Sequence, residues 1–439
     1  MLELTITEHN AIAHSTLGNQ SLADLRSFDE QHARRGVDTV FDWSLSSVVK
    51  AKNYVGVIQT ANVSIEILPK IERSISLGTN DPNHLQCRQN LVYMLSIAGM
   101  LPFYDRGLAS QEVADVPLWE FLIRLFARRL LQELRKGQQH QYLSYDENLN
   151  CVRGRIQLSR DAVINAGLKH RVFVQYDDFN SETLLNRVFK TTCQQLIHRA
   201  SSHRTQQYLR EVLFELADIG ECSVNASDLD QIRFDRNTER FRLAFEFCRL
   251  FLNGMSTTPS RGSMRTFSLL FPMERVFEEF VGQMIRKNAR SLGLLPRQVH
   301  LQAKSKRRWL LRDAFDQGKF RLCPDILAEK AARETQWILD TKWKRLKPKT
   351  QDSKNGVSTS DMYQMFAYSQ RYESRDNILL YPNVPDVSPT EYFVDDTNQK
   401  TRIRIELIDL NYDLSKNRSR LLQDLQQILR SKSGELVKE

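Results

Sequence analysis

Short runs of alternating apolar and polar residues characterise the beginning of the chain. LELTI, YVGVIQT and VSIEILP, which begin at Leu2, Tyr54 and Val63, each follow this pattern, which is typical of strands with one buried face. Asn62 lies between the last two runs, where a turn would join them. We therefore predict a small β-rich domain over residues 1–80 that contains a hairpin.

Helical periodicity dominates the next part of the chain. LWEFLIRLFARRLLQEL, residues 118–134, places an apolar stripe opposite its arginines, and the runs that begin at Leu184 and Phe241 are similar. Between the first two of these helices, YLSYDENLNCVRGRIQL and RVFVQYDDF have the composition of strands. The loop STTPSRGS, residues 256–263, indicates a boundary by its Ser, Thr, Pro and Gly content. We predict a mainly helical domain with a few strands over residues 81–260.

A helix that begins at Pro272 opens the third part of the chain. PMERVFEEFVGQMIRKNA has an apolar stripe and a proline at the favoured first position. Glu274 and Glu278 lie one turn apart beside that stripe. Further along, residues 322–327 and 336–343 are predicted strands, and the short polar segment EKAARET between them is suited to a hairpin.

Two acids and a lysine lie where these hairpin strands end or are interrupted. Asp325 follows Pro324 in the first strand, and Asp340-Thr341-Lys342 ends the second. Side chains two residues apart in a strand share a face, so Asp340 and Lys342 are expected to point together. If the strands pair, Asp325 comes beside Asp340. The alternative is a structural ion pair between Asp325 and Lys342.

Neighbouring carboxylates repel each other, and they are tolerated mainly when they share a proton or bind a cation. Hard oxygen ligands suit Mg²⁺, with Mn²⁺ as a second possibility. A metal held there can polarise a phosphate and activate water, while Lys342 orients that water or stabilises developing charge. The arrangement predicts a phosphodiester hydrolase.

The positive charge of the chain is concentrated around this hairpin. The net charge is +9, and residues 297–349 contain fifteen Lys or Arg against six Asp or Glu. Localised positive charge is typical of a surface that binds a phosphate backbone, although a solvated basic face is the alternative. The candidate phosphate contacts, which would position DNA without reading its sequence, are Lys304, Lys306, Arg307, Arg308, Lys344 and Lys347.

Other features exclude several classes of protein. The chain of 439 residues is long enough for two or three domains. It has no GxxxxGK[ST] loop, so we do not expect it to hydrolyse a nucleotide by itself. Its six cysteines form no CxxC pair and its histidines no HExxH motif, which argues against a zinc site and favours reduced thiols in a cytoplasmic protein. No apolar run approaches the about 20 residues of a membrane span, and no signal peptide is expected.

The order of these motifs resembles a known nuclease superfamily. Pro324-Asp325 followed by Asp340-Thr341-Lys342 resembles the PD-(D/E)xK signature, and Gln364 with Tyr368 resembles the QxxxY helix of one branch. Most of the chain, roughly residues 50–412, is similar to McrC, the nuclease subunit of McrBC-type modification-dependent restriction systems. The further segments that carry this likeness are YVGV at 54–57, IEILPKI at 65–71, VRGR at 152–155, YDDF at 176–179, LNR at 185–187, FPMERVFEEFV at 271–281 and LDTKWK at 339–344.

The resemblance implies an α+β multidomain fold whose last domain, residues 261–439, is a nuclease with a mixed sheet flanked by helices. In such a site Asp325 and Asp340 would bind the metal ion, with the carbonyl of Thr341 as a third ligand. Glu274 would bind a second ion or hold a water molecule, with Glu278 as its rival for this role. Lys342 would orient the attacking water. Residues that would support the site and contact DNA are Gln364 and Tyr368.

The resemblance also implies partners. Members of this family cut double-stranded, modified DNA together with McrB, an AAA+ hexamer that uses GTP in the best-known systems, and they stimulate its hydrolysis. Their N-terminal domain enters the pore of the ring, and two complexes pair through McrC. The polar loop that we predict at about residues 27–42 holds Arg34 and Arg35, a candidate for the pore-facing tip or an ordinary solvated pair. Two alternatives remain open: a nuclease of another motor- or helicase-linked system, and an adaptor that activates the ring without cutting.

Overall fold

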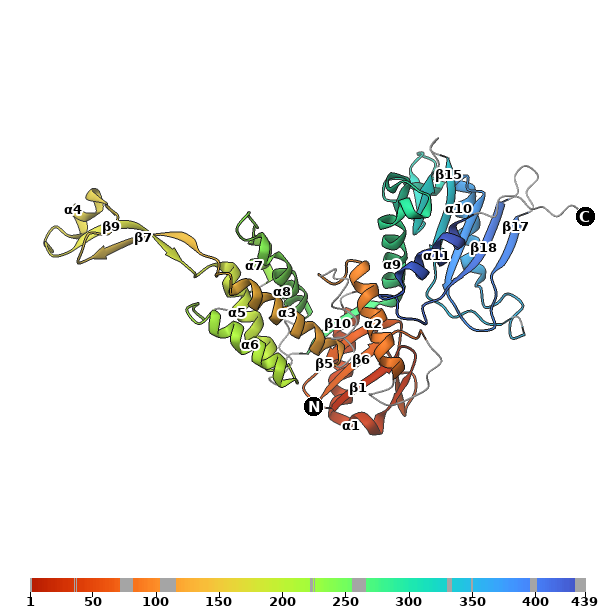
Figure 1. Cartoon of the computed structure of the whole chain (residues 1–439), viewed down its shortest axis with the longest axis horizontal. Helices are drawn as coiled ribbons and strands as arrows, with labels where there is room; N and C mark the ends of the chain where they lie inside the picture. The colour runs from red at the N-terminus through yellow and green to blue at the C-terminus, as the bar shows by residue number, and fades with distance from the viewer. Residues whose placement is uncertain are drawn as a thin grey trace, which may run out of the picture. The chain divides into compact units, whose positions relative to one another are not determined.

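The structure, a computed structural model, combines helices with several separate sheets, which confirms an α+β fold (Figure 1). It describes residues 2–34, 36, 38–71, 82–102, 116–221, 224, 226–254, 266–329, 334–348, 350–394 and 401–430. The chain forms two compact units. Unit 1 joins Met1–Leu118 to Thr258–Glu439, and unit 2 is Trp119–Thr257. The three domains predicted at 1–80, 81–260 and 261–439 stay predictions.

Unit 2 contains a helical bundle with an aromatic core, as its periodicity predicts. The rings of Phe126 and Phe251 meet edge to face at 5.5 Å, and those of Phe189 and Phe241 lie 5.6 Å apart. Offset and edge-to-face contacts of this kind stabilise a core beyond the burial of area alone. The helices are α3 (Leu118–Leu134), α5 (Leu184–Ile197), α6 (His203–Glu215), α7 (Ala226–Gln231), α8 (Arg242–Gly254) and the 3₁₀ turn η1 (Glu239–Phe241).

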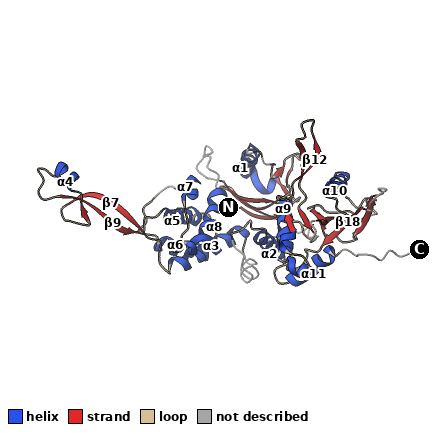
Figure 2. Ribbon diagram, turned by 90° about the horizontal axis from the view of Figure 1, so that it is seen from above, coloured by secondary structure: helices blue, strands red, loops and turns tan. Residues whose placement is uncertain are grey.

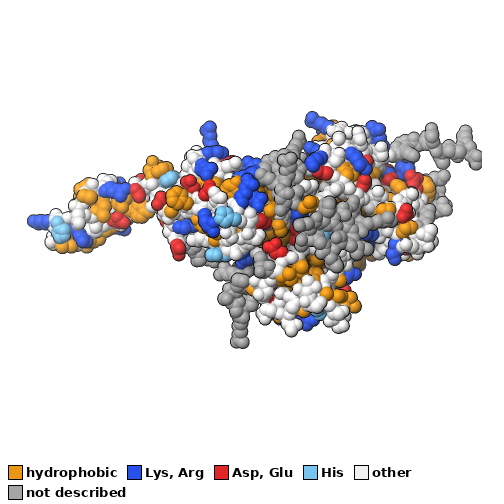
Figure 3. Space-filling model, turned by 60° about the horizontal axis from the view of Figure 1, so that its bottom comes forward, with side chains coloured by type: hydrophobic (Ala, Val, Ile, Leu, Met, Phe, Trp, Pro, Cys, Tyr) orange, Lys and Arg blue, Asp and Glu red, His pale blue; other side chains and the backbone are white. Residues whose placement is uncertain are grey.

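A long antiparallel ribbon extends from these helices (Figures 1 and 2). Its strands β7 (Gln141–Leu149) and β9 (Val172–Asn180) pair over nine positions, which confirms the strands predicted between α3 and α5. At its far end lie β8 (Arg155–Ile156) and helix α4 (Leu158–Ile164). Exposed apolar side chains gather on the ribbon (Figure 3). They are Tyr142, Val152, Leu158, Val163, Ile164, Leu168 and Phe179.

Unit 1 begins with a four-stranded sheet in the order β1-β6-β5-β10. The predicted hairpin is present, since β5 pairs antiparallel with β6 and Ile58 lies opposite Ile65. Strand β10 adds to β5 from far along the chain, and this strand was not predicted. The strands are β1 (Leu2–Thr7), β6 (Val63–Leu68), β5 (Tyr54–Gln59) and β10 (Phe267–Pro272).

Gly56 is required for the pairing of β10 with β5. Its φ is +129°, and a Cβ at this position would lie 2.0 Å from the carbonyl oxygen of Leu269. Only glycine allows so close an approach of two backbones. The glycine of the YVGV segment is therefore explained by the close approach of β10 to β5.

The polar loop predicted at residues 27–42 is wrong over its first part, because helix α1 (His14–Arg34) occupies it. The helix buries Leu25 and Phe28 in the core beneath the sheet. The buried carboxylate of Asp29 accepts a hydrogen bond of 2.6 Å from the backbone N–H of Val40, which fixes the following turn. Strands β2 (Ala11–Ala13), β4 (Val48–Ala51) and β3 (Phe41–Asp42) form a second, three-stranded sheet.

Helix α2 (Pro82–Ile97) joins the first sheet to the C-terminal part of unit 1. The Arg88 guanidinium makes a buried bidentate contact with Glu66, at 2.7 and 2.6 Å. Asn90 on the same helix donates hydrogen bonds to the carbonyls of Leu410 and Tyr412. The two parts of unit 1 are thus connected by hydrogen bonds as well as by strand β10.

The C-terminal part of unit 1 is built on a six-stranded mixed sheet in the order β11-β14-β15-β16-β18-β17. Helix α10 lies on one side of the strands, and α9 and α11 on the other (Figure 2). The strands are β11 (Val299–Leu301), β14 (Ile326–Glu329), β15 (Thr335–Thr341), β16 (Asp376–Pro382), β18 (Thr401–Ile408) and β17 (Thr390–Val394). The helices are α9 (Met273–Lys287), α10 (Thr359–Tyr372) and α11 (Arg418–Leu429).

Three smaller elements complete unit 1. Strands β12 (Arg308–Arg312) and β13 (Gly318–Leu322) form a separate two-stranded ribbon. The 3₁₀ turns are η2 (Ala289–Leu292) and η3 (Pro296–Gln298). None of the helices in the described ranges combines the length and the apolar character that crossing a membrane requires.

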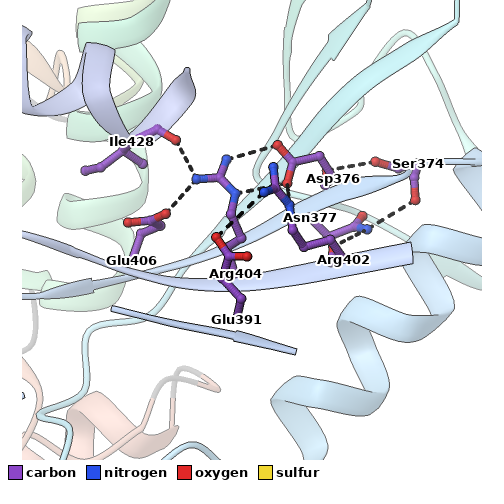
Figure 4. Close-up of polar contacts among 8 residues, drawn as sticks. All are labelled: Ser374, Asp376, Asn377, Glu391, Arg402, Arg404, Glu406 and Ile428. Atoms are coloured by element: carbon purple, nitrogen blue, oxygen red, sulfur yellow. Dashed lines mark hydrogen bonds and ion pairs between the residues drawn. The ribbon is translucent and has the colours of Figure 1, made fainter. Parts of the chain in front are cut away.

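Arg404 anchors the C-terminal helix to this sheet (Figure 4). Its guanidinium contacts both oxygens of Asp376 at 2.9 and 3.0 Å and Glu406 at 2.6 Å. The same group donates a hydrogen bond of 2.8 Å to the carbonyl of Ile428 in α11. A buried arginine is tolerated because its donors are satisfied by two carboxylates and a helix carbonyl.

Candidate functional site

The predicted hairpin brings the two aspartates to the same end of adjacent strands. Strands β14 and β15 pair antiparallel with Ile326 opposite Leu339, so the preceding Asp325 lies at the level of Asp340. The backbone N–H and the hydroxyl of Thr341 both donate hydrogen bonds of 2.7 Å to Asp325 Oδ2. These two bonds fix the orientation of the Asp325 carboxylate.

Lys342 joins this pair of acids from the same strand end. Its ammonium lies 2.5 Å from Asp340 Oδ2, so the expected common face of Asp340 and Lys342 is present. Its backbone N–H donates to the carbonyl of Leu380, which extends the pairing of β15 with β16 by one residue. The ion pair of Lys342 is therefore with Asp340, and the alternative pair with Asp325 is not the one observed.

Helix α10 contributes the glutamine and the tyrosine. Lys342 Nζ donates a hydrogen bond of 2.9 Å to Gln364 Oε1, and Gln364 Nε2 donates one of 2.8 Å to the hydroxyl of Tyr368. One turn separates these two residues on the helix, which explains their four-residue spacing. Tyr368 is buried and orients Gln364, which in turn holds Lys342.

The carboxyl groups of Asp325, Asp340 and Glu278 interact electrostatically at this site. Burial, followed by repulsion from Asp340 and Glu278, raises the pKa of Asp325 well above its usual range. Burial raises the pKa of Asp340 as well, although Lys342 opposes the shift. The pKa of Glu278 is raised by burial and by repulsion from Glu279 and Asp340. A cluster of mutually repelling acids in a buried site is a common feature of functional sites.

The two glutamates of α9 have different surroundings. Glu278 accepts a hydrogen bond of 3.0 Å from Gln302 and interacts with Asp325 and Asp340. Glu274 is exposed and accepts a hydrogen bond of 3.5 Å from the side-chain amide of Asn53 in the N-terminal part. The structure therefore brings Glu278, and not Glu274, to the two aspartates.

The oxygen atoms at this site suit a hard divalent cation. Asp325 and Asp340 supply two carboxylates, and the carbonyl of Thr341 is available from the backbone between Asp340 and Lys342. A cation would relieve the repulsion that adds to burial in raising the pKa of Asp325. Within the described ranges, no three His, Cys, Asp or Glu side chains are already grouped as metal ligands. The donor set fits Mg²⁺ in its chemistry, with a backbone oxygen as the third protein ligand.

The candidate phosphate contacts are dispersed over the surface near the hairpin. The ammonium of Lys344 lies 3.1 Å from Asp361, and that of Lys306 lies 2.9 Å from Glu329. The guanidinium of Arg308 lies over the ring of Tyr372 at 5.7 Å. The remaining three are exposed: Lys304, Arg307 and Lys347. Among these candidates, Lys344 is linked to the acidic cluster, because its partner Asp361 also contributes to the raised pKa of Asp340.

Two residues that shape the site were not predicted from the sequence. Gln302 holds Glu278, and it has a φ of +53°, which is uncommon for a residue other than glycine. Asp361 binds Lys344 and is close enough to raise the pKa of Asp340. Ser358, which caps α10 through the N–H of Asp361, gives an S-x-x-D helix-start pattern that could have drawn attention to Asp361. No local pattern identifies Gln302.

The predicted partner-docking arginines are only partly described. Arg34 ends helix α1 and is exposed. Arg35 lies outside the described residues. The docking role of both remains a prediction.

Comparisons with known proteins agree on one family. The family model described as McrBC 5-methylcytosine restriction system component matches residues 49–382. The chain is 22% identical over 337 residues to the type IV methyl-directed restriction enzyme EcoKMcrBC of Escherichia coli (strain K12), a match that covers 73% of this chain and 90% of that protein.

Two solved structures from Thermococcus gammatolerans are similar in fold. The first is a half-complex from a tetradecameric assembly of McrB AAA+ hexamers with bound McrC. Its matching chain has a TM-score of 0.73 at 19% identity, with 96% of this chain and 100% of that chain covered. The second is a cryo-EM structure of the McrBC complex, with a TM-score of 0.54 at 21% identity over 65% and 88% of the two chains.

Proposed function

This chain belongs to the family of McrBC 5-methylcytosine restriction system components, and from that membership we propose that it is the subunit that cuts DNA in a restriction complex. One observation carries the proposal. Asp325, Asp340 and Lys342 lie together at the ends of two paired strands, in the order and spacing of a PD-(D/E)xK nuclease. The activity would be a Mg²⁺-dependent endonuclease that restricts foreign DNA.

The protein side of the mechanism follows from the contacts. Asp325, Asp340 and the carbonyl of Thr341 would hold Mg²⁺ or Mn²⁺. The bound ion would polarise the scissile phosphate and lower the pKa of the attacking water. Thr341 fixes Asp325 through two hydrogen bonds, so this carboxylate is already oriented. The geometry reduces the reorganisation that the reaction would otherwise require.

Lys342 and Glu278 have complementary roles in this proposal. The ammonium of Lys342, held by Gln364 at 2.9 Å, orients the water and stabilises negative charge that develops on the phosphate. Glu278, rather than Glu274, takes the auxiliary role, because it is the glutamate that interacts with both aspartates. Its carboxylate can accept the proton of the attacking water or hold a second ion.

We further propose that the chain acts together with an AAA+ NTPase hexamer and stimulates its hydrolysis. The fold is similar to that of a chain in an assembly of McrB hexamers with bound McrC, and that assembly contains two half-complexes. By analogy, two copies of this chain would cut the two strands of a modified duplex. We expect such an assembly to act in the cytoplasm, where it would meet its DNA substrate.

The ribbon of β7 and β9 is the element that we assign to this partner. Leu158 and Val163 near its far end are 74% and 80% exposed, and apolar side chains at such exposure are suited to a protein contact. The alternative is the sequence-based prediction of the Arg34 and Arg35 region. Arg34 ends a helix whose other face is packed into the core, so it offers less apolar area for docking.

The test is cleavage of methylated and unmethylated plasmid by the full chain with an AAA+ partner encoded beside it, in Mg²⁺ with GTP or ATP. Asp340→Asn should lower the cleavage rate by at least about 100-fold, since it removes a metal-binding carboxylate, while nucleotide turnover by the ring persists. Asp316→Asn is a matched control, because Asp316 is an aspartate with a side chain 79% exposed.

Three outcomes distinguish the functions. Cutting that needs both proteins and is lost only in Asp340→Asn supports the nuclease. Stimulated nucleotide turnover without cutting by any form would favour an adaptor. Cutting that needs a helicase instead of the AAA+ ring would assign the chain to another DNA-processing system.

A further inference from the structure

The short ribbon of β12 and β13 lies directly before the catalytic cluster in the chain. Its second strand ends at Leu322, and Cys323 and Pro324 connect it to Asp325. The short ribbon forms a sheet of its own and projects from the body of unit 1 (Figure 2). A large molecule that binds along it would therefore lie beside the two aspartates.

Helix α10 fixes the base of the short ribbon. The hydroxyl of Tyr372 lies 3.0 and 3.3 Å from the carbonyl oxygens of Lys306 and Leu322 and shares a hydrogen bond between them. One side chain thus connects the two ends of the ribbon. The same helix carries Gln364, which holds Lys342. The position of the ribbon and that of the proposed catalytic lysine are therefore set by one helix.

An ordered turn presents an aromatic ring at the tip of the short ribbon. The carboxylate of Asp313 accepts hydrogen bonds of 3.0 and 2.9 Å from the backbone N–H groups of Phe315 and Gln317. Phe315 is 86% exposed, and Leu311 and Phe320 are exposed on the strands that lead to the tip. Apolar side chains that an ordered turn holds in water are typical of a surface that a partner covers.

The charge of the short ribbon indicates the nature of this partner. Residues 304–322 contain seven Lys or Arg against two Asp. Three of the seven cations are paired with acids: Lys319 with Asp313 at 3.2 Å, Arg312 with Asp316 at 2.6 Å and Lys306 with Glu329 of β14 at 2.9 Å. The other four are exposed and form no ion pair within the described part of the chain: Lys304, Arg307, Arg308 and Arg321. The two acids of the ribbon are thus neutralised within it, and an excess of positive charge remains.

Duplex DNA is complementary to both the charge and the shape of the short ribbon. Its phosphates attract the unpaired cations, and its major groove is wide enough to admit a two-stranded β-ribbon. Apolar side chains can contact thymine methyl groups inside that groove. The apolar surface of another protein would cover Phe315 but would leave the neighbouring cations without partners in the interface. Charge complementarity therefore favours the duplex.

We propose that the short ribbon is an arm that lies in the major groove of the DNA duplex beside the cut, with Arg307 and Arg321 on phosphates and Phe315 on base edges. The proposal rests on the nuclease function proposed above. It adds Arg321 and Phe315 to the DNA contacts predicted from the sequence. Because Tyr372 ties the arm to the helix of Gln364, an arm seated in the groove would fix the position of the duplex relative to the catalytic cluster.

Binding of a labelled duplex to the full chain, measured by fluorescence anisotropy at several salt concentrations without divalent metal, tests the proposal. Arg307→Gln and Arg321→Gln should each weaken binding several-fold. Each should also make the slope of log affinity against log salt shallower by about 0.9, the value for one lost phosphate contact. Phe315→Ser should weaken binding several-fold and leave the slope unchanged, because it removes an apolar contact and no charge.

Helix α6 of unit 2 supplies matched controls. Arg204 is exposed, and Phe214 is 80% exposed, close to the exposure of Phe315. Arg204→Gln and Phe214→Ser should bind the duplex with the affinity and the salt slope of the wild type. All five substitutions are at exposed positions, so the fold should be unaffected.

Each possible result decides the question. Equal effects of the ribbon variants and the control variants overturn the proposal. Losses confined to the two arginine variants, or to single-stranded DNA, overturn the placement in the groove. Unchanged binding of the duplex with weakened binding to the AAA+ ring also overturns it, because the tip is then a protein contact.

Cleavage in Mg²⁺ is measured separately, so that the arm and the nuclease can fail independently. If the wild type cuts DNA and the ribbon variants bind the duplex as the wild type does, the arm is excluded and the nuclease is retained. If the expected losses of binding occur in a chain that never cuts DNA, the arm is supported and the nuclease is excluded.

Discussion

Glu274 and Glu278 show how far a single residue can be assigned from sequence. Both flank the apolar stripe of α9, and a one-turn spacing does not distinguish them. In the structure Glu278 is half-buried and bonded to Gln302, whereas Glu274 is exposed. Gln302, which bonds to Glu278, comes from a separate segment of the chain, so no local pattern distinguishes the two glutamates. Asp325, Asp340 and Lys342 could be grouped from sequence because the period of a strand determines their common face.

The two glutamates can be separated by kinetics. Glu278→Gln should lower the cleavage rate at saturating DNA by about 100-fold, the usual contribution of a general base, because Gln cannot accept the proton or bind an ion as a carboxylate does. Glu274→Gln should change the rate far less, because Glu274 is exposed and its hydrogen bond is with Asn53 of the N-terminal part. Single-turnover cleavage under identical conditions is the measurement. A larger loss of rate in Glu274→Gln would restore the assignment made from sequence.

Glu8 makes the stability of the fold depend on pH. Burial raises the pKa of its carboxyl from 4.5 to about 7, so between these values the folded protein keeps a proton that the unfolded chain has lost. Its contribution is fully present below about pH 4.5 and is lost as pH rises through about 7, by roughly 3 kcal/mol in all. This change has the opposite sign to that of an ion-paired carboxylate.

Glu8→Gln should remove this dependence. The free energy of unfolding of the variant, measured relative to that of the wild type, should be larger at pH 8 than at pH 5 by roughly 3 kcal/mol. The reason is that Gln has no proton to lose. Urea unfolding at both pH values is the measurement, and the exposed Glu3→Gln is the control. The same difference in both variants would show that Glu8 is not the group responsible.

At the scale of elements, the predictions succeed where the partner is local. The hairpin of β5 with β6 and that of β14 with β15 follow from alternation and a short connection. Strand β10 was missed because its partner, β5, lies about two hundred positions away in the chain. The last turns of helix α1 were taken for part of a loop because this end of the helix is mostly polar.

Strand β18 shows a second limit of pattern reasoning. TRIRIELI alternates charged and apolar residues, a pattern typical of a strand with one face in water. Arg404 is nevertheless only 3% exposed, because α11 covers that face. The arginine is held by Asp376 and Glu406, so the polar face is satisfied by ion pairs instead of water. Helix α11, which lies near the end of the chain, thus buries a face of β18 that the sequence pattern of the strand alone would place in water.

At the scale of the whole molecule, the catalytic cluster and the ribbon belong to different compact units. The cluster lies in unit 1, whose two chain segments are joined by β10 and by the hydrogen bonds from Asn90 to the carbonyls of Leu410 and Tyr412. The ribbon lies in unit 2 and contributes none of the residues of the cluster. Contacts with the partner and contacts with DNA can therefore be altered independently.

The separation of the two units allows docking on the ribbon to be tested without altering the catalytic cluster. Replacing Leu158 and Val163 of the ribbon with Ser should weaken binding to the AAA+ ring at least tenfold, or about 1.4 kcal/mol, because it removes exposed apolar area. The fold should be unaffected, since both side chains lie at the surface. Binding of the duplex to the chain alone should also be unchanged.

The chain offers a matched control in its other ribbon, where Leu311 and Phe320 are 55% and 70% exposed. Replacing these two with Ser removes similar apolar area from unit 1. Affinity for the ring, measured by its stimulated nucleotide turnover at increasing concentrations of the chain, should fall only in the first pair. If the affinity falls only when Leu311 and Phe320 are replaced, the partner docks on unit 1, which carries the catalytic cluster. The Arg34 region of that unit would then again be a candidate docking site.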